Sequence, residues 1–317
     1  MRKKRIITSV VILLCTVGLF FSRLWTPLVF DLAFGALAVV ACIEVSKVAY
    51  AAGKPNNAYF VCTYPATLYL VTMFYLNKKF TFSYYIFILL MLLLAYFLII
   101  FIITGSMHKT SVDEMGKIGY KGSKWHFALD KSMFSISLMV YPALLFLSII
   151  ILNHFTEFTS VSALNLSGNI ISMFLLVTVF AVTMICDSMA MITGITFKGK
   201  KLCPKISPNK TISGAIGGLI GGIASAFVVY ALFNLSPSFV SDFSAIGGNA
   251  WHILIVGIVG AIISQIGDII ASLLKRHADV KDYGNIFPGH GGVMDRMDGL
   301  IFNSAFVMLF FVLIVII

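Results

Sequence analysis

Long apolar runs separated by short polar segments divide the chain. Nine runs approach 20 residues, the length that an α-helix needs to cross a bilayer. They cover residues 6–22, 27–46, 58–77, 83–105, 133–153, 168–187, 212–234, 250–274 and 299–317. No internal repeat or low-complexity linker separates them. The pattern therefore predicts an all-α, polytopic membrane protein with a single membrane domain over residues 1–317.

The first run follows the basic residues 2–5, an arrangement that resembles a signal peptide. The run has no small-residue cleavage pattern before Arg23, so we expect a retained first span.

Composition agrees with a lipid-embedded chain. Hydrophobic residues make up 59% of the sequence and charged residues 11%, against roughly 25% charged in soluble domains. The net charge is +10, but the basic residues lie in short loops between spans. Attraction to anionic lipid headgroups and nucleotide phosphates fits this placement. No zinc-finger spacing or basic–aromatic stretch indicates a nucleic-acid partner.

Charge also predicts the orientation. If the N-terminus is inside, 20 of the 23 Lys and Arg residues fall in inner segments, as the positive-inside rule expects. These segments are residues 1–5, 47–57, 106–132, 188–211 and 275–298. Nine spans then place the C-terminus outside, and one span more or fewer would break the bias.

Acidic and basic residues gather in the last two inner segments. The acids in or beside these segments are Asp187, Asp268, Asp279, Asp282, Asp295 and Asp298. Carboxylates can hold a hard cation while Lys and Arg hold phosphate oxygens, which suits a metal-bound polyphosphate. Ordinary solvated loops with positive-inside charges are the alternative, and composition does not separate the two.

Asp268 favours the functional interpretation because it lies inside an apolar run, where a carboxylate is costly. Helical spacing puts Asp268, Ser272 and Lys275 on one face. A stripe of small residues turns the same helix toward protein rather than lipid. The stripe consists of Gly257, Gly260, Ser264, Gly267 and Ala271. A carboxylate–lysine pair that serves packing alone is the alternative.

Three further acids lie in apolar runs. Asp187 is predicted at the inner end of the sixth span, where it is either functional or simply solvated. Asp31 and Glu44 lie at or inside the second span and have no predictable partner, so we interpret them as structural or peripheral. The glycines that open the seventh span, Gly214, Gly218 and Gly222, predict close helix packing rather than ligand contact.

The loop 287–299 holds the densest set of polar and glycine residues. Glycine lets backbone N–H groups approach phosphate oxygens, and His290 stands among glycines. Asp295 and Asp298 are three residues apart, so on a helical turn both would point the same way.

Residues 272–298, SLLKRHADVKDYGNIFPGHGGVMDRMD, are similar to the signature of the phosphatidate cytidylyltransferases, also called CDP-diglyceride synthases. The matching residues are Ser272, Lys275, Arg276, Lys281, Asp282, His290, Gly291, Gly292, Asp295, Arg296 and Asp298. A second stretch, from Asp187 to Gly214, also resembles the family and keeps its Ser207-Pro-x-Lys210-Thr segment. It departs from the family at Ser188, Met191 and Ser213. The likeness covers roughly residues 180–300, whereas residues 1–160 match only as divergent apolar spans ahead of the motif-bearing part at 168–317.

The resemblance implies transfer of CMP from CTP to phosphatidic acid, which yields CDP-diacylglycerol and pyrophosphate in the cell membrane. It also implies Mg²⁺, with a second cation left open, and a multi-span fold able to form a homodimer. We expect Asp268, Asp295 and Asp298 to bind the metal directly or through water, with Asp187 a weaker candidate. Basic residues are expected to hold phosphate oxygens: Lys210, Lys275, Arg276 and Arg296. His290, Gly291 and Gly292 are expected to line the triphosphate, beside Ser207, Ser272, Lys281 and Asp282 as further binding residues.

Three other functions were weighed against this one. A cytidylyltransferase for another lipid phosphate, such as an isoprenoid one, would share the same residues. The Asp-Gly-x2-Ala-Arg motif of CDP-alcohol phosphotransferases does not occur. An ion-coupled transporter would use an intramembrane Asp, but transporters often show paired repeats, which this chain lacks.

Overall fold

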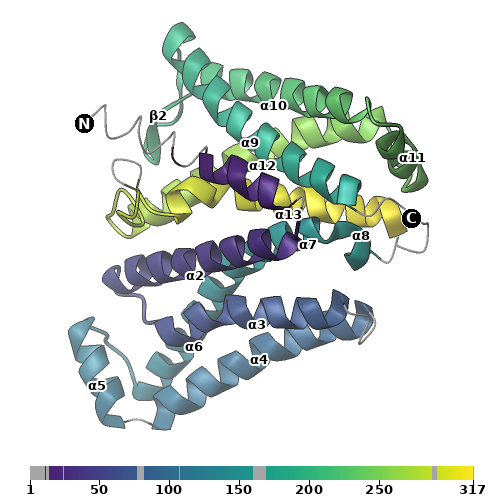
Figure 1. The fold of residues 1–317 in the computed structure, drawn as a ribbon. Coiled ribbons are helices and arrows are strands. Elements are labelled where there is room, and N and C mark those ends of the chain that lie inside the picture. Colours follow the sequence, from purple (N-terminus) through teal and green to yellow (C-terminus); the bar gives the residue numbers. More distant parts are fainter. Residues whose placement is uncertain are drawn as a thin grey trace. The chain divides into compact units, whose positions relative to one another are not determined.

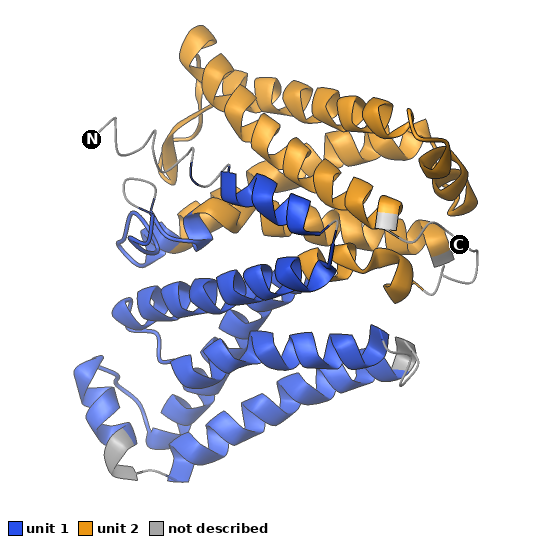
Figure 2. Ribbon diagram, in the orientation of Figure 1, with its two compact units in different colours: residues 1–147, 275–295 blue, residues 148–274, 296–317 orange. Residues whose placement is uncertain are grey.

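The computed structural model describes residues 11, 14–23, 25–76, 82–106, 108–159, 169–287 and 291–316. The chain forms two compact units, drawn in separate colours in Figure 2. Unit 1 holds residues 1–147 and 275–295, and unit 2 holds residues 148–274 and 296–317. The signature segment 275–295 therefore belongs with the N-terminal spans. The single membrane domain predicted from the sequence stays a prediction.

The elements of unit 1 are almost all helical (Figure 1). They are α2 (Pro27–Ala51), α3 (Ala58–Leu76), α4 (Phe82–Ser106), α5 (His108–Lys117), α6 (Lys124–Leu138) and a π-helical segment, Met139–Leu144. Helix α2 packs on α3, and α4 packs on α6, around the buried rings of Phe30, Tyr64 and Phe127. The buried hydroxyls of Thr72 and Tyr85 form a hydrogen bond with each other at 3.0 Å, as is general for buried polar groups.

Unit 2 contains the remaining helices and a short hairpin. Its elements are α7 (Leu145–Asn153), α8 (Phe155–Phe158), α9 (Asn169–Phe197), β1 (Lys201–Cys203), β2 (Ser207–Thr211), α10 (Ile212–Phe233), α11 (Pro237–Ala245), α12 (Ala250–His277) and α13 (Met294–Ile316). The first residues of α7 and the ends of α12 and α13 at 275–277 and 294–295 lie in unit 1. Strands β1 and β2 pair antiparallel and bring Lys210 to the start of α10.

Helices α9 and α10 make the closest contact in unit 2, and glycines allow it. A Cβ on Gly214 would lie 2.7 Å from the Ala190 carbonyl oxygen, and one on Gly218 would lie 3.0 Å from that of Cys186. The prediction that these glycines serve helix packing is confirmed. An aromatic cluster packs between α9 and α11 in the same unit. In it, the ring centroids of Phe174 and Phe239 lie 4.8 Å apart.

Eight helices in the described part of the chain are long and apolar enough to cross a membrane. They correspond to the second through ninth predicted spans, so the polytopic all-α class is confirmed. Of the first predicted span, 6–22, the structure describes residues 11 and 14–22, and these are helical. Which end of the chain faces inside stays a prediction.

Several predicted boundaries are wrong by up to ten residues. The run expected to end at 187 continues as helix to Phe197, and the run expected to start at 133 begins at Lys124. Helix α13 starts at Met294 rather than 299. The two early starts run through charged residues such as Lys124, Asp130 and Asp295, which a hydropathy pattern excludes. The extension at 188–197 carries no charge and lies beyond Asp187, where the predicted run ended.

Candidate active site

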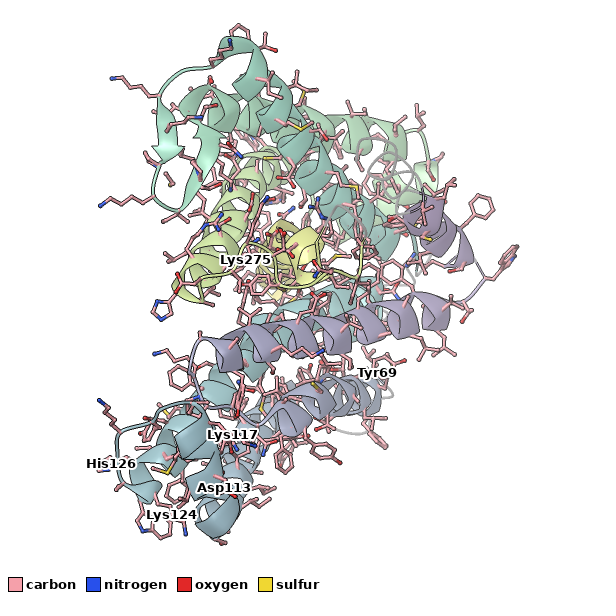
Figure 3. The ribbon with its side chains drawn as sticks, turned by 90° about the vertical axis from the view of Figure 1, so that its left-hand side faces the viewer. Tyr69, Asp113, Lys117, Lys124, His126 and Lys275 are labelled. Carbon is pink, nitrogen blue, oxygen red and sulfur yellow. The ribbon has the colours of Figure 1, made fainter. Side chains whose placement is uncertain are left out.

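Asp295 organises the signature loop within unit 1. One carboxylate oxygen, Oδ1, accepts from Lys275 Nζ at 2.7 Å. The other, Oδ2, accepts the backbone N–H groups of Tyr283 at 2.8 Å and Gly292 at 2.9 Å. The Asp295 side chain is 3% exposed. Lys275, near the end of α12 (Figure 3), also lies over the Tyr283 ring with its Nζ 5.4 Å from the centroid.

The loop is closed a second time beside Asp295. The N–H of Phe287 donates to the carbonyl of Gly291 at 2.9 Å. Gly291 has a φ of +85°, and a Cβ there would lie 2.8 Å from Asp295 Oδ2. Only glycine suits such a position. The intervening His290 lies outside the described residues, so its expected role stays a prediction.

A second charged cluster lies in unit 2. Lys210 Nζ, from the hairpin, pairs with Asp268 Oδ2 at 2.7 Å. The Ser272 hydroxyl, one turn along α12, lies 3.5 Å from Asp268 Oδ1. Asp187 on α9 lies within electrostatic range of Asp268, Lys210 and Arg296. Two carboxylates and two cations from four elements of unit 2 thus lie within electrostatic range of Asp187 or pair directly; their expected roles stay predictions.

Helix α12 turns the face expected from its spacing toward protein. All five residues of its small-residue stripe are buried. A Cβ on Gly267 would lie 2.9 Å from the Asp298 carbonyl oxygen and 2.7 Å from the Phe302 ring. This close approach to α13 places Asp298, itself 8% exposed, beside α12. The Asp298 carboxylate accepts the N–H of Gly299 at 2.8 Å.

The other predicted residues lie at or just after the end of α12 and in β2. Lys281 and Asp282 are exposed. Arg276 donates to the Val280 carbonyl at 3.3 Å and so supports the turn after α12. Ser207 is half-buried in β2, opposite Cys203. No role for these residues follows from the geometry alone.

One residue near the signature loop was missed by the sequence analysis. Glu44, on α2, accepts backbone N–H groups of Val293 and Met294. The contact joins residues about 250 positions apart, so no local pattern reveals it. The only sequence signal was a carboxylate inside an apolar run.

The unit 2 cluster fits the expected magnesium ion. Magnesium is usually held by one or two carboxylates, with water and substrate phosphates completing its shell. Asp187 and Asp268 supply two such carboxylates in electrostatic range of one another. No group of three or more His, Cys, Asp or Glu side chains suited to a metal occurs among the described residues. The predicted set Asp268, Asp295 and Asp298 stays a prediction.

These features define a membrane-embedded member of a nucleotidyl-transfer family. The model of the cytidylyltransferase family matches residues 3–314, and the chain belongs to that family.

Named relatives agree with this family. The chain is 43% identical over 133 residues to a phosphatidate cytidylyltransferase of Rickettsia felis, covering 42% of this chain and 56% of the relative. A protein of the same name from Rickettsia bellii is 42% identical over 147 residues, covering 46% and 61%. These matches span little more than half of each relative. A phosphatidate cytidylyltransferase of Haemophilus influenzae is 28% identical over 304 residues, which is 95% of both chains.

Proposed function

We propose that this protein transfers the cytidylyl group of CTP to phosphatidic acid, giving CDP-diacylglycerol and pyrophosphate at the inner face of the cell membrane. The observation that carries the proposal is the unit 2 cluster, in which Lys210 pairs with Asp268 at 2.7 Å and Asp187 lies within electrostatic range of both and of Arg296. Carboxylates with cations suit a metal–polyphosphate substrate. Family membership and the names of the relatives support the same reaction.

The chemistry requires charge neutralisation more than proton transfer. The second pKa of a phosphate monoester is near 6, so the lipid phosphate is largely anionic at pH 7. Its oxygen forms a bond to the α-phosphorus of CTP while the bond from that phosphorus to the bridging oxygen breaks. Pyrophosphate leaves with the electron pair, and no general base is needed.

The residues of this chain would bring the two anions together. Lys210 and Arg296 would bind phosphate oxygens, and Arg276 would add positive charge at the end of α12. Asp268, with Asp187 or Asp298, would hold Mg²⁺, which when bound would neutralise phosphate oxygens. Lys275 and Asp295 would fix Tyr283 and Gly292 at the two ends of the glycine loop (residues 284–292), which would lie against the triphosphate.

The test is turnover by purified protein in detergent. With CTP, phosphatidic acid and Mg²⁺ we expect release of pyrophosphate, with none after EDTA treatment and recovery on adding excess Mg²⁺. Absence of turnover with folded, detergent-solubilised protein would contradict the proposal. Turnover without a sealed membrane would also set aside the ion-coupled transporter.

The lipid substrate needs a separate comparison. An isoprenoid phosphate has the same headgroup chemistry, so the charged residues do not select between the two lipids. We expect phosphatidic acid to give a kcat/KM at least about 10-fold higher, about 1.4 kcal/mol of transition-state preference. The reverse order would reassign the substrate. The predicted homodimer is tested in the same preparation by its mass in detergent.

A further inference from the structure

Glu44 provides a contact between the N-terminal spans and the signature loop, both of which lie within unit 1. Its side chain sits in the apolar helix α2 and is only 4% exposed. A carboxylate in such a place is costly and marks a functional site by default. The backbone offers the compensation: Oε1 accepts the N–H of Val293 at 3.0 Å, and Oε2 accepts the N–H of Met294 at 2.9 Å.

These two N–H groups begin helix α13. The first amides of a helix have no partner within the helix, and the helix dipole favours a negative charge there. The side chain that caps the start of a helix usually belongs to the residue just before that helix. Here the cap comes from a residue about 250 positions away, so it determines where α13 begins relative to α2.

Two glycines of the signature loop pack directly on the same carboxylate. A Cβ on either Gly284 or Gly292 would overlap the Glu44 oxygens. The carboxylate therefore contacts both ends of the segment 284–292, and neither end has space to move closer.

Glu44 and Asp295 together bind three consecutive amides. Gly292 N–H donates to Asp295, and Val293 and Met294 donate to Glu44. Asp295 also carries the Tyr283 amide and Lys275. Displacing the Glu44 carboxylate would release the residues next to the loop that Asp295 holds.

We propose that Glu44 is a positioning residue for cytidylyl transfer. Its contacts with Gly284, Gly292 and the start of α13 hold these residues in the arrangement that binds the triphosphate. The inference rests on the proposed function, because it assigns the loop to CTP. It goes further by giving a residue of the divergent N-terminal part a role in the reaction.

The main test is Glu44→Gln, which keeps the shape of the side chain but replaces one acceptor oxygen with a donor. We expect the purified variant to remain folded and to lose about 10-fold or more in kcat/KM for CTP, with a raised KM for CTP. Glu114→Gln is the matched control: Glu114 is another carboxylate of unit 1 that accepts a hydrogen bond, from Lys131 at 2.6 Å, but it lies outside the loop. It should keep the wild-type KM for CTP even if its unfolding temperature falls.

Gly284→Ala tests the same contact from the loop side. It should impair kcat/KM while Glu44 is present, and the Glu44→Ala/Gly284→Ala double variant should be no worse than Glu44→Ala alone. Such non-additivity is expected only for residues that touch. If Glu44→Gln does not fold, the comparison of Gly284→Ala, Glu44→Ala and the double variant still tests the contact between Glu44 and the loop.

Two results would overturn the inference: an unchanged kcat/KM per folded molecule in Glu44→Gln, or fully multiplicative losses in the double variant. Both are measured against active wild-type protein. Failure of the wild-type itself to release pyrophosphate would instead contradict the proposed function.

Discussion

At the residue scale, Asp295 matters because its single carboxylate accepts hydrogen bonds from three donors. Lys275 is itself only 12% exposed. Removal of one partner from a buried pair leaves an uncompensated charge, which costs far more than the pair contributes. The two backbone donors add a geometric requirement, since they hold the loop at both Tyr283 and Gly292.

Asp295→Asn should therefore lower kcat by about 100-fold or more, a loss typical for a preorganised charged group. The amide keeps the size of the side chain but cannot accept from Lys275 and both amides together. Pyrophosphate release by detergent-purified protein measures the effect. Asp113→Asn, on the exposed face of α5, is the matched control and should keep wild-type turnover. A wild-type rate in Asp295→Asn would remove this residue from the reaction.

The Lys210–Asp268 pair leads to a different expectation. Its side chains are 24% and 36% exposed, so the pair contributes little to stability, about 0–1 kcal/mol. Lys210→Met should leave the unfolding temperature nearly unchanged but lower kcat/KM by about 10-fold or more, because a phosphate-binding cation is lost.

Lys205→Met supplies the control for Lys210→Met. Lys205 is an exposed lysine of the same hairpin, but Lys210 rather than Lys205 pairs with Asp268, so turnover should be unaffected. Equal losses in both variants would indicate a general effect of hairpin charge rather than a role for Lys210.

At the element scale, the contact between α9 and α10 determines where the hairpin lies, because β1 and β2 connect the two helices. The contact depends on helix backbones that approach without intervening side chains. It brings Lys210 to Asp268 and keeps Asp187 on the neighbouring helix within reach.

Gly214→Ala should force α10 away from α9, because the added Cβ would meet the Ala190 carbonyl oxygen at 2.7 Å. Overpacking of this kind costs about 1–3 kcal/mol. Thermal unfolding in detergent measures the change, and turnover should fall with it as the hairpin shifts.

Gly35→Ala is the matched control, since a Cβ on Gly35 of α2 would meet nothing within 4 Å. Alanine favours helix over glycine by up to about 1 kcal/mol, so this variant should be as stable as wild-type or more so. The same outcome in Gly214→Ala would show that α9 and α10 can separate without cost.

The elements themselves were largely predictable, because spanning helices are set by a simple physical requirement for about 20 apolar residues. Hydropathy could not predict their ends. Helix α12 continues to Lys275, Arg276 and His277 because cations at a helix C-terminus interact favourably with its dipole. Helical spacing correctly placed Asp268, Ser272 and Lys275 on one helix. Asp295 and Asp298, expected in an inner loop, belong instead to the first turns of α13.

What the sequence could not reveal were contacts between distant segments. The Lys210–Asp268 pair and the Glu44 cap join residues 58 and about 250 positions apart. Each depends on how helices pack, which hydropathy and spacing do not encode. A carboxylate in an apolar run indicated that a partner must exist, but its identity required the structure.

At the scale of the whole molecule, two contacts in unit 1 bear on the predicted topology. Gly53 lies near the carbonyl oxygen of Ile118, and Glu44 reaches Val293. Three of the segments expected inside, 47–57, 106–132 and the part of 275–298 that belongs to unit 1, thus lie at the same end of unit 1. An even number of crossings between them is required, which agrees with the charge bias.

The orientation can be tested by single-cysteine labelling in intact cells, in a background where the five native cysteines are replaced. Lys205→Cys, in the hairpin, should be protected from a membrane-impermeant maleimide until the cells are opened, because positive-inside charge places it in the cytoplasm. Ser241→Cys, in the lysine- and arginine-free segment 235–249, should react in intact cells. Both sites are exposed, so accessibility to the reagent depends on the side of the membrane. Reaction of Lys205→Cys in intact cells would reverse the topology and place the CTP-binding cluster on the side where the nucleotide is absent, which would contradict the proposed function as well.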